Sequence, residues 1–175
     1  MGKTKEALFA MTIDHITLGQ TLSQSRAKCL KLAAAASVAY PKTDPFVQDL
    51  FTQIQAFDLL KSKMDSVFHG ETSDAEFENL GHPYYPQRSS DHSEPDIGIA
   101  IYRPRIGNRK RRFSSDETLA ARTCLREVSE SLKNAKEVIS DYGSQHGVLV
   151  VLKYAQFRNR VAGSHVGLWT EEATT

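Results

Sequence analysis

The chain has 175 residues, of which 40% are hydrophobic and 25% charged, and its formal net charge is +1. This length and composition suit one globular domain and argue against a wholly disordered chain. A membrane-spanning helix is not expected, because no apolar run approaches the roughly 20 residues that cross a bilayer. No apolar segment follows Lys3 and Lys5 as it would in a secretion signal. We therefore predict an intracellular location, with cytoplasmic preferred over nuclear.

The first predicted helix covers about Asp14 to Tyr40. Pro41 stops it, because the residue before a proline avoids the helical region. One side carries apolar residues at helical spacing and is predicted to face the core. These residues are Leu18, Leu22, Cys29, Leu32 and Ala36.

The second predicted helix begins with Asp44 as its N-cap and Pro45 at the first helical position. Gly70 closes it. Its apolar stripe indicates a second core-facing side. The stripe consists of Val47, Leu50, Ile54, Phe57 and Met64, and is widened by Phe46, Phe51 and Phe68.

A long irregular insertion follows, from about 71 to 113, and its two halves carry opposite charge. From Glu71 to Asp96 there are seven acidic residues and one basic residue, Arg88. The ten residues Arg103–Arg112 carry six basic side chains and no acidic one. Irregular segments of this length are usually functional or disordered. One short strand is predicted where Ile97, Ile99 and Ile101 alternate with smaller residues.

The third predicted helix opens at Ser114, which forms a capping box with Glu117, and it ends at Gly143. Its apolar seam alternates steps of four and three residues. The seam either packs against the first two helices or pairs with the seam of a second copy. We favour the first alternative, because most amphipathic helices of a single domain face their own core. A homo-oligomer would use Ala121, Leu125, Val128, Leu132, Ala135 and Ile139, with Tyr142 ending the seam.

The fourth segment runs from His146 to about Ala162, and its apolar run suits a strand as well as a helix. We predict a helix, because a helical seam continues through Val150, Tyr154, Phe157 and Val161. Trp169 is expected to dock the C-terminal segment onto the bundle. The sequence thus predicts an all-α fold as a single helical domain over 1–175, a bundle of about four main helices with the charged insertion between the second and third.

The basic cluster is the first candidate site. Arginine offers a planar fork of donors to phosphate oxygens, and such contacts supply most sequence-independent affinity for nucleic acid. Flanking rings suit the stacking of a single-stranded base. We predict a non-enzymatic protein that binds nucleic acid, RNA more than DNA, or another polyanion. A solvated loop, a nuclear-targeting stretch and an intramolecular partner for the acidic half are the alternatives. The site consists of Arg103, Arg105, Arg109, Lys110, Arg111 and Arg112, flanked by Tyr102 and Phe113.

A second candidate site consists of Arg158, Asn159 and His165. Histidine exchanges protons at neutral pH, and arginine stabilises charge that develops on a phosphodiester. In spacing and location these residues resemble the motif of HEPN domains, which are bundles of four or five helices and often metal-independent ribonucleases acting as dimers. The resemblance covers eight residues, Arg158–His165. It implies catalytic roles for all three side chains.

A second resemblance concerns the segment Ser115–Leu119, the basic loop ahead of it and Gly167–Thr170. Together they look like the last helix and tail of the coat proteins of rod-shaped plant viruses, which hold RNA with a basic loop while their subunits stack. About a third of the sequence is covered, and the first half does not follow that pattern. The resemblance implies a self-assembling structural protein without catalysis.

Neither metal nor cofactor is predicted. The three histidines His69, His82 and His92 have carboxylates nearby, but their spacing matches no tetrahedral or facial-triad site. Cys29 and Cys124 belong to no CxxC or Cys/His pattern. Each lies in an apolar stripe, where a free thiol behaves as a small buried hydrophobe.

Overall fold

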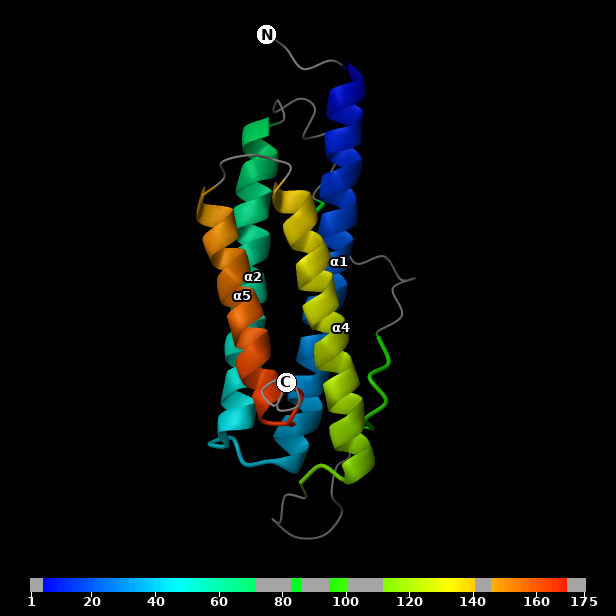
Figure 1. Ribbon diagram of the computed structural model, residues 1–175, viewed down its shortest axis with the longest axis vertical. Coiled ribbons are helices and arrows are strands. Elements are labelled where there is room, and N and C mark those ends of the chain that lie inside the picture. Colours follow the sequence, from blue (N-terminus) through cyan, green and yellow to red (C-terminus); the bar gives the residue numbers. More distant parts are fainter. Residues whose placement is uncertain (1–4, 72–82, 86–94, 101–111, 141–145, 170–175) are drawn as a thin grey trace.

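Four long helices make up most of the computed structural model, which describes residues 5–71, 83–85, 95–100, 112–140 and 146–169 (Figure 1). The described residues contain no strand, so the predicted all-α bundle is confirmed. None of the described helices is both long and apolar enough to cross a lipid bilayer. The helices are α1 (Lys5–Ala39), α2 (Pro45–Glu71), α4 (Ser115–Ser140) and α5 (His146–Ser164).

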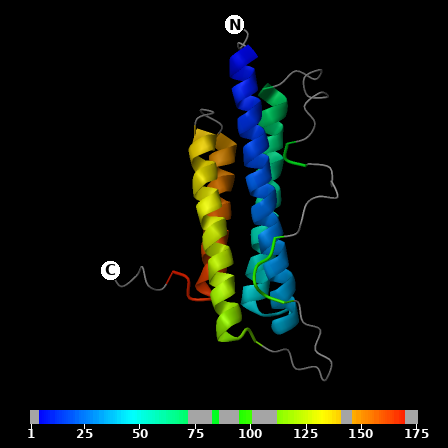
Figure 2. The same ribbon diagram turned by 90° about the vertical axis from the view of Figure 1, so that its right-hand side faces the viewer.

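The four helices form a ring in which each lies antiparallel to its two neighbours. Both α1 and α5 pack against α2 and against α4. In Figure 1, α2 and α4 both start at the lower end of the bundle. The chain that joins the end of α2 to the start of α4 therefore has to run back along the length of the bundle. Parts of this α2–α4 connection are described, at 83–85 and 95–100, and the second part crosses α1 in Figure 2.

Local capping decides where the helices begin. The backbone N–H of Phe46 donates to Asp44 Oδ1 at 2.9 Å, as expected for an N-cap. Ser114 and Glu117 exchange reciprocal bonds of 3.0 and 3.2 Å, which confirms the capping box. The start of α1 at Lys5 is earlier than predicted, because the added residues include good helix formers and no proline.

The C-terminal end of α5 closes on a glycine. Gly167 has a φ of 73°, and the N–H of Leu168 donates to the carbonyl of Gly163 at 3.0 Å. This is the hydrogen bond of a Schellman motif. Trp169 follows at once and packs, partly buried, against the core, as predicted. The predicted end of the preceding helix, at Tyr142 and Gly143, lies outside the described residues.

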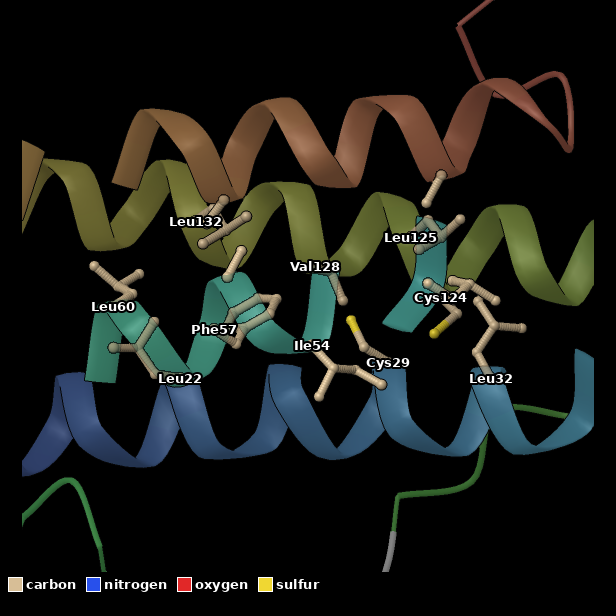
Figure 3. Packing of buried hydrophobic residues seen from close by; sticks show 14 of the residues in the cluster. Leu22, Cys29, Leu32, Ile54, Phe57, Leu60, Cys124, Leu125, Val128 and Leu132 are labelled. Carbon is tan, nitrogen blue, oxygen red and sulfur yellow. The ribbon is translucent and has the colours of Figure 1, made fainter. Parts of the chain in front are cut away.

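The core is built from the predicted seams of the first three helices. Leu22, Cys29 and Leu32 of α1 meet side chains of α2 and α4 between the helices (Figure 3). Every residue of the α4 seam from Ala121 to Ile139 is at most 2% exposed. The seam therefore packs within its own chain, and an oligomer that used it would have to open the bundle.

Two predictions about buried faces are wrong. Val150, Tyr154 and Phe157 are 68%, 39% and 57% exposed, so three of the four predicted seam residues of α5 face solvent, and the fourth, Val161, is partly buried. Phe51 of α2 is 46% exposed as well. On α5 the opposite side is buried, through Val148, Leu152, Ala155, Asn159 and Ala162. Both sides of α5 are apolar, so periodicity alone does not choose between them.

The described parts of the α2–α4 connection are held on α1. The buried Tyr84 hydroxyl lies 2.6 Å from Nδ1 of the buried His15. Lys31 Nζ donates to the carbonyl of Pro95 at 2.9 Å. Residue 19 has to be glycine, because a Cβ there would collide with the backbone of Pro83. Ile97 and Ile99 are buried but form no strand, which corrects that prediction, and Ile101 lies outside the described residues.

Both thiols should be unreactive in the folded protein. Burial raises the pKa of Cys124 to about 12 and raises the pKa of Cys29 well above its ordinary value. Because the thiolate is the nucleophile, neither cysteine should react with an aromatic disulfide reagent at neutral pH until a denaturant unfolds the chain. Thr123→Cys, at an exposed position of α4, provides the reactive control. Rapid reaction of the native parent protein would contradict the packing of α1 against α4.

Candidate nucleic-acid interface

The predicted basic cluster is described only at its C-terminal end. Arg103, Arg105, Arg109, Lys110, Arg111 and the flanking Tyr102 lie outside the described residues. Arg112 is described and exposed. The cluster therefore joins the bundle directly before the capping box of α4.

Phe113 anchors this end of the cluster. Its ring is partly buried and packs edge-on against Tyr40 at 5.3 Å and Phe46 at 6.0 Å between centroids. Phe46 in turn lies 5.7 Å from the ring of His165, directly after α5. Phe113 was predicted as a ring for base stacking, and in the structure its contacts are with the protein. The cluster thus ends beside the C-terminus of α5.

The structure also shows a basic ridge on α4, made of Arg122, Arg126, Lys133 and Lys136. Their spacing of four, seven and three residues puts them on one side of the helix. Arg122 Nε donates to the carbonyl of Val166, so this side borders α5. Arg126, Lys133 and Lys136 are exposed, and within the described residues none of the three has a carboxylate partner within 4.0 Å.

The adjoining side of α5 is basic as well. The helix contains no acidic residue. Lys153, Phe157 and Arg160 follow one another at steps of four and three, so they share one side of α5, and all three are exposed. The Arg160 guanidinium lies 5.7 Å from the centre of the Trp169 ring. We refer to the basic ridge with these three residues as the α4–α5 face.

The opposite flank of α4 has the reverse charge. There Glu127 accepts a 3.0 Å bond from Lys28 Nζ of α1. An open groove of about 500 Å³ lies next to it, between α4 and residues 96–98, and is lined by three carboxylates. These belong to Asp96, Asp116 and Glu127. A polyanion would therefore be repelled from this flank and attracted to the α4–α5 face.

Sequence reasoning missed the basic ridge for an identifiable reason. Glu127, Glu130 and Glu137 are interleaved with the basic residues, so the local sum of charge along α4 is small. Sorting the charges by helical position separates Glu127 from the ridge, whereas Glu130 and Glu137 follow Arg126 and Lys133 by four residues and border the exposed side of the ridge. The absence of acidic residues from α5 also indicates a basic surface and can be seen in the sequence.

The second predicted site is partly assembled, around a residue that the sequence did not indicate. His165 Nε2 lies 2.6 Å from Asp49 Oδ2, and Arg158 Nη1 lies 4.0 Å from Asp49 Oδ1. Asp49 belongs to the start of α2, so α2 brings the two predicted catalytic side chains together. No continuous helix does so, because α5 ends at Ser164, before His165.

Asn159 does not join this site. Its side chain is 1% exposed and points into the bundle, where Oδ1 accepts from Gln53 Nε2 and Nδ2 donates to the carbonyl of Leu125 at 3.0 Å. These bonds connect α5 to α2 and to α4. Asn159 is thus a structural residue, and the role implied by the HEPN resemblance does not fit its burial.

Aromatic rings surround the Arg158 guanidinium. It lies 5.5 Å from the ring centre of Tyr154 and 5.8 Å from that of Phe157, and its Nε donates to the Tyr154 hydroxyl at 3.2 Å. The arginine is therefore held in one orientation by Asp49 and by two partly exposed rings.

No group of three or more His, Cys, Asp or Glu side chains within the described part of the chain is arranged to hold a metal ion. Comparison with protein-family models, with curated proteins and with solved structures finds no match to this chain.

Asn159→Ala should lower the free energy of unfolding by about 1–3 kcal/mol, because it leaves Nε2 of the buried Gln53 without an acceptor and removes the added bond to the Leu125 carbonyl, which keeps its helical bond. Urea denaturation measures the loss. Adding Gln53→Leu should return part of it, since the buried amide that lost its acceptor is then removed. Asn134→Ala, at an exposed position of α4, is the control and should change stability by less than about 0.5 kcal/mol. Equal midpoints for the two single variants would contradict the buried polar contact.

Proposed function

We propose that this protein binds nucleic acid, RNA in particular, without catalysis, and that the basic cluster Arg103–Arg112 makes the main contact. One observation carries the proposal. The cluster ends at an exposed Arg112 whose neighbour Phe113 is packed against the bundle, so six basic side chains are attached to a fixed point of the fold. A binding role also fits the cytoplasmic or nuclear location that the sequence predicts.

The physical basis is the charge density of the cluster. The whole chain has a net charge of +1, so its long-range field is weak and a polyanion would be attracted locally. Each basic side chain that neutralises a phosphate releases condensed counterions. Affinity should therefore fall steeply as salt is added, and it should depend little on base sequence.

Replacing Arg109, Lys110, Arg111 and Arg112 by alanine should weaken the binding of single-stranded RNA. The slope of log K against log salt should fall by up to about 3, at about 0.7 for each lost phosphate contact. Fluorescence anisotropy of a labelled oligonucleotide across a salt series measures both. Lys42→Ala with Lys63→Ala removes exposed charge elsewhere and should have little effect. Unchanged binding by the cluster variant, or salt-independent binding by the parent, would refute the proposal.

A second candidate function, metal-independent RNA cleavage, is favoured by the position of Asp49. A carboxylate bonded to one imidazole nitrogen holds the ring in one orientation and tautomer, as in hydrolase triads. His165 would then use its other nitrogen for proton transfer, and Arg158 would stabilise the charge on the phosphate.

Under this second candidate, His165→Ala should abolish cleavage of a labelled RNA in the presence of a metal chelator, and Asp49→Asn should reduce it strongly. His69→Ala is the matched control, because His69 also lies next to an aspartate, Asp65, at 3.5 Å. The products are read on a denaturing gel. An inactive parent protein, or equal products from the parent and His165→Ala, would eliminate ribonuclease activity at this site.

A further inference from the structure

We infer that the α4–α5 face is a second nucleic-acid contact, which binds a single strand with its phosphates along the basic ridge and a base against Phe157. This inference rests on the proposed RNA binding and extends it, because it assigns the class of ligand and places part of the site on the described helices.

The ridge is long enough to follow the sugar–phosphate backbone of a nucleic-acid strand. From Arg122 to Lys136 it extends about 21 Å along α4, at about 1.5 Å per residue. Lys153 and Arg160 of α5 lie on the adjoining side of the neighbouring helix and widen the track. A strand lying along the two helices would thus meet cations on both sides.

Phe157 is the ring that suits a base. It is 57% exposed, and Lys153 and Arg160 lie one helical turn away on either side. The Arg158 guanidinium lies 5.8 Å from the ring centre, and the rest of the exposed ring suits stacking, because every base offers a π-face. Bases of a duplex are already stacked on each other. The face should therefore prefer a single strand.

The C-terminus of α5 also lies close to Phe113, which directly follows the basic cluster in the chain. The rings of Phe113, Phe46 and His165 are in successive contact, and they lead from the end of the cluster to the C-terminus of α5. Arg160 and Phe157 are on the last turns of that helix. A strand bound at Arg112, the described end of the cluster, can therefore reach α5 without crossing the acidic groove beside Asp116.

A second copy of the chain is a poorer occupant. Homodimers usually form by a two-fold axis, which brings the same surface of both subunits together. Here it would bring together two surfaces on which exposed cations outnumber the carboxylates of Glu130 and Glu137, and this excess of like charge opposes association. Charge complementarity thus favours a polyanion.

The first arm of the test neutralises two charges at a time. Arg126→Gln with Lys133→Gln should reduce the affinity for a labelled oligouridylate several-fold and lower the salt slope by about 1.4. Lys42→Gln with Lys63→Gln removes the same charge from exposed positions outside the face and should leave both quantities near those of the parent. Equal behaviour of the two variants would overturn the inference. If, in that case, the alanine variant of Arg109–Arg112 still bound RNA more weakly than the parent, the proposed function would stand and only the second contact would be refuted.

The second arm tests stacking. Phe157→Ala should weaken oligouridylate binding about tenfold without changing the salt slope, and Phe157→Trp should restore it. Phe51→Ala, which removes a similarly exposed ring from α2, is the control. The parent should bind duplex RNA more weakly than the single strand. Loss of binding in Phe51→Ala equal to that in Phe157→Ala, or no preference for a single strand, would contradict a stacking site.

A third measurement needs only the parent protein. Photo-crosslinking to an oligouridylate that contains 4-thiouridine, followed by peptide mapping, should yield adducts within 153–160. Adducts confined to 101–113 would overturn the inference and leave the proposed function intact. A change of elution volume caused by the Arg126→Gln, Lys133→Gln variant in the absence of RNA would show instead that the face contacts another copy. Absence of any RNA binding by the parent would refute both proposals.

Discussion

The arrangement of the helices depends on one buried polar contact. Asn159 of α5 bonds to Gln53 of α2 and to the backbone of Leu125 in α4, all in the interior. An amide without these partners would be costly to bury, so α5 has a single favourable rotation and a single height relative to its neighbours. Apolar packing alone would not impose this, because α5 carries large hydrophobic residues around most of its circumference.

The rotation of α5 about its axis determines which of its side chains are exposed and which neighbouring helix each one faces. With Asn159 inside, Arg158 is turned toward α2, where Asp49 lies, and Lys153 and Arg160 are turned outward on the other flank. The same orientation exposes Tyr154 and Phe157. Both candidate sites on the helices, the Asp49 cluster and the α4–α5 face, thus follow from a contact that takes part in neither.

Features encoded by neighbouring residues were predictable from the sequence, and features decided across the bundle were not. The Asp44 cap, the Ser114 box and the α4 seam depend on spacings of at most a few turns, and all agree with the structure. The buried side of α5 was predicted wrongly, because the partner of Asn159 is 106 positions away in the chain. The pairing of His165 with Asp49 spans 116 positions and leaves no local pattern. The basic ridge was hidden by the acidic residues between its members.

The antiparallel ring has a consequence for how the chain acquires its structure. α1 with α2 forms one helical hairpin and α4 with α5 another, and five residues of the chain separate the two helices of each. Contacts between the hairpins, such as Lys28 with Glu127, join residues about a hundred positions apart. Closing so long a loop costs entropy before any contact repays it, whereas each hairpin forms from local contacts. The two hairpins are therefore expected to form early and to dock late. During docking, the hydrogen bond between Gln53 and Asn159 favours the correct register of the two hairpins over other registers that make only apolar contacts.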